Sequence, residues 1–198
     1  MRVNIINFLI LIFIISSCDN NKKLNYIDLE DNITQKIVDE NALIYFDKGE
    51  NYLKESKFDS AIVNYKKSLN FEKNTLTYNQ IGVCEDFKKN IDKAIEFYQF
   101  GIEADTTYYT NYLNLAKCYI AKKELETAEK HLLKVIENNS SKYSVALANL
   151  HLTIVYFNQN RDCSEIIKQF KKAGILKDDD KMSDFYQFSN NKIEKRCR

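Results

Sequence analysis

The side chains in this chain best suited to catalysis or metal binding are those of two histidines and five cysteines. His131 and His151 lie far apart in the sequence, and no Cys, Glu or second His joins either of them at a metal-ligand spacing. No Gly-rich phosphate loop, nucleophile elbow or paired-carboxylate motif is present either. The sequence therefore favours neither an enzyme nor a metal-binding protein, and we expect no cofactor.

Four of the cysteines lie in the body of the chain. Cys84 and Cys118 occupy equivalent positions of a repeat, on helices whose axes we expect to lie about 8–10 Å apart. A disulfide needs Cα atoms within about 7 Å, so we predict that both are buried small apolar residues. Cys163 stands where Phe58, Ile91 and Leu125 begin the second helix of the other units. A packing role therefore explains the presence of Cys163. The alternative is a disulfide between Cys163 and Cys197 that holds the final helix.

The fifth cysteine follows a charged and then apolar N-terminus. Arg2 precedes the apolar run Val3 to Ile15, which is too short to span a bilayer comfortably. Ile15-Ser16-Ser17-Cys18 resembles the bacterial lipoprotein box, an aliphatic residue and two small residues before a Cys. This resemblance implies that the Cys18 thiol takes a diacylglycerol and that the signal, residues 1–17, is cut just before it. An uncleaved anchor or an ordinary signal that happens to carry a Cys is the alternative.

The lipoprotein interpretation sets the expected location and the first two segments of the chain. Residues 18–30 become the lipidated Cys and a tether, and several acyl chains could hold the protein stably at a membrane. We expect a soluble domain outside the cytoplasm of a bacterial cell, anchored in the outer membrane rather than the inner one. Asp19 follows the Cys, at a position that guides sorting in some bacterial families by rules that differ between them.

Composition indicates an all-helical protein that does not bind nucleic acid. The chain has 198 residues, no Pro and only four Gly, so residues that form turns between strands are scarce. Its 29 Lys and Arg are balanced by 28 Asp and Glu. This balance gives no bias toward a polyanion.

One pattern of small and apolar residues recurs three times between Ala42 and Ser141. The recurring small residues are Gly49, Gly82 and Ala116, and then Ala61, Ala94 and Ala128, at intervals of 33 and 34 residues. In each unit two runs of helical periodicity are separated by a short polar turn. A small residue at the crossing point lets the two helices approach closely. A single hairpin cannot bury both of its faces, so we expect the units to stack.

This unit resembles the tetratricopeptide repeat, which has an aromatic residue, a Leu-Gly pair and a Tyr in its first helix and Ala, Phe and Ala in its second. Tyr45, Tyr78 and Tyr112 stand in place of the family's Trp, and its helix-ending Pro is absent. We expect Asn74-Thr75, Thr106-Thr107 and Asn138–Ser141 to end one helix and cap the next instead. The resemblance implies an all-α, right-handed α-solenoid over residues 31–177.

The segments around the three clear units complete the predicted solenoid. A helix from about Asp31 would run into the first repeat as a leading cap. Lys142–Asn158 and Glu165–Gly174 would form a fourth, degenerate hairpin, with about three extra residues before it. Residues 178–198 are predicted to form a capping helix over the open end of the stack. The alternative for this helix is presentation to a partner.

The resemblance also implies a concave groove lined by the first helices of the units. The residues assigned to it by register are Phe46, Glu50, Leu53, Asn79, Val83, Asp86, Leu113, Lys117 and Ile120. The family's best-known subclass holds a terminal carboxylate with Lys, Asn and Arg, but Phe46 and Glu50 replace its first Lys and Asn. We therefore exclude that mode and expect an extended or helical segment of another protein. For any single apolar residue, burial between repeats remains the competing explanation.

Together these patterns predict an envelope-anchored lipoprotein that acts as a protein-binding adaptor or scaffold. Its expected partners are another envelope protein and the membrane lipid, without nucleic acid. The rival prediction is an envelope protein that binds a glycan or a small ligand, which the thirteen Tyr suggest. Most of these Tyr fall on repeat positions, which weakens that rival.

Overall fold

The computed structural model describes residues 37–139 and 141–197, and every regular element in these two ranges is helical. The predicted signal, Cys18, the tether and most of the predicted leading helix lie outside them. The elements are α2 (Glu40–Lys54), α3 (Phe58–Phe71), α4 (Thr75–Phe87), α5 (Ile91–Ala104), α6 (Tyr109–Ala121), α7 (Leu125–Asn138), α8 (Lys142–Asn158), α9 (Cys163–Lys171), the 3₁₀ turn η1 (Gly174–Leu176) and α10 (Ser183–Cys197).

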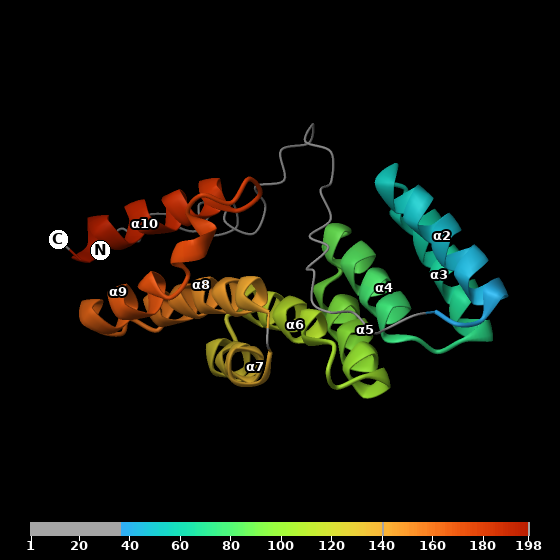
Figure 1. The fold of residues 1–198 in the computed structure, drawn as a ribbon, viewed down its shortest axis with the longest axis horizontal. Helices are drawn as coiled ribbons and strands as arrows, with labels where there is room; N and C mark the ends of the chain where they lie inside the picture. Colours follow the sequence, from blue (N-terminus) through green and yellow to red (C-terminus); the bar gives the residue numbers. More distant parts are fainter. Residues whose placement is uncertain (1–36, 140, 198) are drawn as a thin grey trace, which may run out of the picture.

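Consecutive helices pair into four hairpins that follow one another along the molecule. In Figure 1 the series runs from α2 and α3 on the right, through α4 to α7, to α8 and α9 on the left. Each hairpin packs on the next, and α10 lies against α9 and α8 at the far end. The predicted fold class is confirmed: the chain is a right-handed α-solenoid with a C-terminal capping helix.

Polar side chains begin several of the helices, as predicted in two places out of three. The Asn74 side chain accepts the N–H of Leu76 at 2.8 Å at the start of α4, and Ser141 Oγ accepts the N–H of Ser144 at 3.2 Å at the start of α8. The prediction for Thr106-Thr107 was wrong. The Thr107 side chain donates to Asp105 at 2.7 Å instead, and α6 begins without a side-chain cap.

The first described helix begins later than the sequence suggested. The predicted helix from about Asp31 does not run into the repeat, because residues 37–39 are non-helical and Asp39 caps α2. Glu72, at the end of α3, accepts the N–H groups of Val38 at 2.7 Å and Asp39 at 2.8 Å. Desolvation alone would raise the Glu72 pKa, but these donors lower it below its usual value. The carboxylate therefore holds the chain in a non-helical conformation before α2.

A small residue marks the crossing of the two helices in each of the first three hairpins, and the side chain opposite is smaller where that residue is Ala than where it is Gly. A Cβ added to Gly82 would lie 2.5 Å from Cε1 of Tyr98, and one added to Gly49 would meet the ring of Tyr65 in the same way. In the third hairpin the equivalent residues are Ala116 and Leu132, both fully buried. A methyl group at the crossing thus accompanies a smaller side chain opposite, which is how close packing maintains the helix spacing.

The turn inside every hairpin contains one non-glycine residue in the left-handed conformation. These residues are Ser56, Lys89, Lys123 and Asn160, with φ between 57° and 65°. Their recurrence shows that α8 and α9 follow the same design as the first three hairpins. Asn160 follows Lys123 by 37 residues, so three extra residues are present, as the spacing predicted. They lie within the hairpin and not before it, because α8 has 17 residues where α6 has 13.

The fourth hairpin and the final helix close the solenoid. The helix α8 has the predicted bounds Lys142–Asn158, whereas α9 covers Cys163–Lys171 and not Glu165–Gly174. Gly174 instead begins the turn η1. Met182, just before α10, and Ile193 within it are buried in the same core as α8 and α9. This burial covers the apolar end that the last hairpin would otherwise expose.

Candidate functional site

The structure divides the nine predicted groove residues into a buried set and an accessible set. The buried residues are Leu53, Asn79, Leu113 and Ile120, each at most 8% exposed. These side chains pack between consecutive hairpins, because their positions in the first helices face the following unit as well as the concave side. Their assignment to an accessible groove is corrected: they are interior residues that hold the stack together.

The accessible residues form a row across the first helices of three hairpins. We call Phe46, Glu50, Val83, Asp86 and Lys117 the open strip. All five are partly exposed. Glu50, Val83 and Lys117 occupy equivalent positions of successive units, 33 and 34 residues apart. The strip therefore offers two apolar side chains, two carboxylates and one ammonium group along one face.

The Glu50 carboxylate is held in a fixed position at one end of the strip. Its Oε1 accepts the hydroxyl of Tyr65 at 2.5 Å and the side-chain N–H of Gln80 at 2.6 Å. These donors come from α3 and α4, so Glu50 connects three helices. The Phe46 ring leans on the same Tyr65, with centroids 5.5 Å apart. A partner would therefore meet a carboxylate and an aromatic ring whose rotamers are already set.

Asn79 takes part in a buried hydrogen-bond chain that fastens the second hairpin to the third. Its side-chain N–H donates to Asn111 Oδ1 at 2.8 Å, and Asn111 donates to Thr75 Oγ1 at 2.9 Å. The Thr75 hydroxyl then donates to the carbonyl of Gly101 at 2.8 Å. A Cβ on Gly101 would collide with the Asn111 side chain, so this glycine makes room for the chain of bonds. The sequence signal was a polar residue at an interior helical position, in Thr75 and Asn111.

On α8 the residue that corresponds to Lys117 is Ile154, because Asn160 is the turn residue equivalent to Lys123. One helical turn before it lies His151. The final helix α10 covers this residue: its ring lies 6.0 Å from that of Phe185, and the side chain is buried. Burial, with a smaller contribution from the charge of Lys117, lowers the His151 pKa to about 3. His151 is therefore a neutral packing residue at neutral pH.

His131 is also a packing residue. Its ring stacks on Tyr119 with centroids 5.6 Å apart, and burial lowers its pKa. Among residues 37–139 and 141–197, no group of three or more His, Cys, Asp or Glu is arranged to hold a metal ion. Three of the Tyr that suggested glycan binding are core residues, namely Tyr65, Tyr98 and Tyr112.

The cysteines fall into one bonded pair and two buried thiols. Cys84 and Cys118 are free and buried, and burial raises the pKa of both thiols to about 12. This burial agrees with their prediction as packing residues. Cys163 and Cys197 form a disulfide between the start of α9 and the end of α10, the alternative that the sequence had left open.

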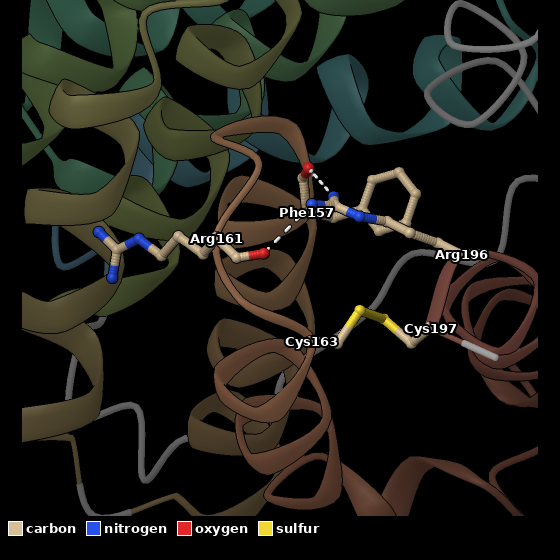
Figure 2. Close-up of a disulfide and its surroundings, with 5 residues drawn as sticks. All are labelled: Phe157, Arg161, Cys163, Arg196 and Cys197. Carbon is tan, nitrogen blue, oxygen red and sulfur yellow. Dashed lines mark hydrogen bonds between the residues drawn. A yellow bond between two sulfur atoms is a disulfide. The ribbon is translucent and has the colours of Figure 1, made fainter.

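The residue before the disulfide adds a second attachment for α10. Figure 2 shows the Arg196 guanidinium reaching the end of α8, where it donates to the carbonyls of Phe157 at 2.5 Å and Arg161 at 3.1 Å. Cations at the C-terminal end of a helix stabilise its exposed carbonyls. Arg161 itself pairs with Glu129 of α7 at 2.8 Å. The capping helix is thus tied covalently and by charge to the fourth hairpin.

Cys18 and the lipoprotein box lie outside the described residues. Within the ranges that the structure covers, no helix is both long and apolar enough to cross a bilayer.

The fold and the repeated face define a solenoid of helical hairpins. Residues 109–142, which contain the third hairpin, match the family model of the tetratricopeptide repeat. The Hsp70-Hsp90 organising protein of Plasmodium falciparum (isolate 3D7) is 26% identical over 127 residues, which are 63% of this chain and 20% of that protein. This chain therefore spans only a small part of that relative's length.

Solved structures share the fold at low sequence identity. MamA aligns with a TM-score of 0.61 and 22% identity over 67% of this chain and 76% of its own. The first tetratricopeptide domain of Spaghetti (RPAP3), bound to the HSP90 peptide SRMEEVD, aligns with a TM-score of 0.56 and 21% identity. That alignment covers 61% of this chain and 94% of the Spaghetti domain. At such identities the likeness shows the fold alone.

Proposed function

We propose that this protein is a lipid-anchored adaptor of a bacterial envelope, which binds a segment of another protein along the open strip. The lipoprotein box at Ile15–Cys18 supports the anchor, with Cys18 as the lipidated residue and a membrane, the outer one in preference to the inner, as the location. The folded domain would lie outside the cytoplasm, at the end of the tether.

The observation that carries the binding proposal is that α10 covers the first helix of the fourth hairpin. At the fourth hairpin, Phe185 of α10 packs on His151, which lies on the first helix one turn before the position equivalent to Lys117. The first-helix face of this solenoid therefore accepts an aromatic side chain from a helix. At the first three hairpins the open strip is partly exposed, so it is available to a helix or strand from another protein.

The chemistry of the strip indicates what the partner segment carries. Phe46 and Val83 offer apolar contacts, whereas Glu50 and Asp86 would attract basic side chains and repel a terminal carboxylate. The Spaghetti domain, by contrast, is bound to an acidic HSP90 peptide ending in EEVD. The partner of this chain is therefore a segment with apolar and basic side chains, and not a chaperone C-terminus.

Affinity capture from gently solubilised envelopes tests the binding proposal. The full chain is compared with Asp86→Ala/Lys117→Ala and with a control, Lys93→Ala/Lys130→Ala, whose residues are exposed on the second helices α5 and α7. One protein should co-purify near stoichiometrically with the wild type and the control and be depleted with the strip variant. Equal capture by all three would refute a role for the strip.

Fractionation of Cys18→Ala tests the anchor separately. We expect this variant to leave the membrane fraction and to keep a longer N-terminus, because neither lipidation nor cleavage before residue 18 can take place. A variant that stays membrane-bound to the same extent, or a wild-type protein that retains Met1, would contradict the lipoprotein assignment.

A further inference from the structure

The outer side of the first hairpin is polar where later hairpins are apolar. We call the residues Tyr45, Lys48, Asn51, Tyr52, Asn64 and Lys67 the end face. Thirty-three residues further on, Lys48, Asn51 and Asn64 correspond to Ile81, Cys84 and Phe97. Those three pack against the first hairpin, and Ile81 and Cys84 are fully buried there. The end face lacks such apolar residues, so it is not built to receive another hairpin.

A hollow of about 640 Å³ lies on this face, between α2 and α3. Two ammonium groups converge on one ring beside it: Nζ of Lys48 lies 5.1 Å and Nζ of Lys67 5.6 Å from the ring centroid of Tyr45. Phe71 stacks on the same ring at 5.8 Å and is half exposed. The hollow therefore joins positive charge to exposed aromatic surface.

Within residues 37–139 and 141–197, no acid neutralises the two lysines of the end face. Glu55 is the one acid lining the hollow, and its carboxylate pairs with Lys57 at 2.8 Å. Among the described residues, no carboxylate lies in salt-bridge range of Lys48 or Lys67. An anionic ligand would thus meet two ammonium groups that no described carboxylate holds, with amide and phenol groups beside them.

The end face is also the part of the solenoid closest along the chain to the predicted lipid anchor. Asp39, which precedes α2, lies 21 positions after Cys18. Fully extended, that stretch spans at most about 75 Å. A tether of this kind keeps the first hairpin at a high effective concentration of headgroups, so even a weak site is occupied. Lys near anionic lipid and aromatic rings at the headgroup level are both favourable at such a surface.

We propose that the end face rests on the anionic phospholipid headgroups of the membrane in which Cys18 is anchored. This proposal rests on the lipid anchor proposed above. It gives the solenoid an orientation, with the hairpin α2–α3 at the bilayer and the α10 end directed away from it. The open strip, which runs along the stack, then extends outward from the membrane to reach a partner.

Lysine acylation, measured residue by residue with mass spectrometry, tests the proposal on the full lipidated protein. The protein is inserted into vesicles of neutral phosphatidylcholine or into vesicles that also contain phosphatidylglycerol. A lysine side chain prefers an anionic membrane surface to a neutral one by about fivefold. Lys48 and Lys67 should therefore be acylated roughly fivefold more slowly on the anionic vesicles than on the neutral ones. Exposed Lys93 and Lys130 are internal controls and should react equally on both. About 0.5 M salt should remove the difference, because it screens exposed charges.

The outcomes separate this proposal from the one on which it rests. If the protein floats with the vesicles but Lys48 and Lys67 react at the same rate on both kinds, the anchor stands and membrane docking is overturned. A protein that does not float overturns the anchor and the docking together. Selective protection of the two lysines by a soluble acidic oligosaccharide without vesicles would assign the hollow to a glycan and overturn the membrane proposal.

Discussion

The crossing point of the second hairpin allows the packing rule of this solenoid to be tested with two substitutions. In Gly82→Ala the new methyl group would lie 2.5 Å from Cε1 of Tyr98, well inside ordinary contact. Alanine in a helix interior gains about 1 kcal/mol over glycine. Overpacking a closely packed interior costs about 1–3 kcal/mol. We expect the clash to win, with a net loss of about 1 kcal/mol in the free energy of unfolding.

The third hairpin supplies the compensating change. Converting the pair Gly82 and Tyr98 to the pair found there, Ala116 and Leu132, requires the additional substitution Tyr98→Leu. Alone, this leaves a cavity and should cost about 2–4 kcal/mol. In the double variant the methyl group enters space vacated by the ring, so the clash disappears and the helical gain remains. The two changes should therefore couple by about 1–2 kcal/mol.

Urea unfolding followed by circular dichroism at an unchanged m-value measures all four proteins of this cycle. Gly174→Ala is the matched control, because a Cβ there meets nothing within 4 Å. The control should unfold at or above the wild-type midpoint. Additive effects in the cycle to within about 0.5 kcal/mol, or a stabilising Gly82→Ala, would refute the reasoning from close packing.

Three other properties follow from the same structure. Replacing the bridge, as Cys163→Ser/Cys197→Ser, should lower the free energy of unfolding by about 4 kcal/mol, because the disulfide joins residues 34 apart; equal urea midpoints for the variant and the oxidised wild type would contradict this. The His151 pKa lies at about 3, below its usual 6.5, so the unfolded state binds a proton first and stability falls as pH drops through that interval. Thermal melts from pH 7 to pH 4 should show a steeper loss for the wild type than for His151→Gln, and parallel losses would contradict the burial. Cys84 and Cys118, with pKa values near 12, should resist a maleimide at pH 8 until the protein unfolds, whereas labelling of the native protein would show that they are accessible.

The repeat itself could be predicted from the sequence because small residues recur at fixed intervals. The two helices of a hairpin must approach closely at one point in each unit, and Gly82 and Ala116 mark that point in the sequence. The bounds of α8 followed from apolar periodicity between Ser141 and the turn at Asn160. The start of α2 did not, because it depends on Glu72, which is distant in sequence and binds two N–H groups there.

The groove could be predicted only in part, because periodicity gives the face of a helix but not how far the next hairpin covers it. Leu53 and Leu113 lie on the predicted face, yet the following hairpin buries both of them. Glu50 and Lys117 lie one turn away from those residues, on the uncovered side, and stay accessible. Sequence alone also left the pairing of Cys163 open, since packing accounted for it equally well.

Photo-cross-linking from the open strip tests the adaptor proposal most directly. A photoreactive residue is placed at Val83, which is partly exposed in the strip, or at Lys93 on α5 as the control, in the full chain within intact envelopes. Illumination should produce one discrete adduct from position 83 that is absent from position 93, and the adduct should carry the partner's basic and apolar segment. The same set of adducts from both positions, or none from position 83, would contradict the claim that this strip binds another protein.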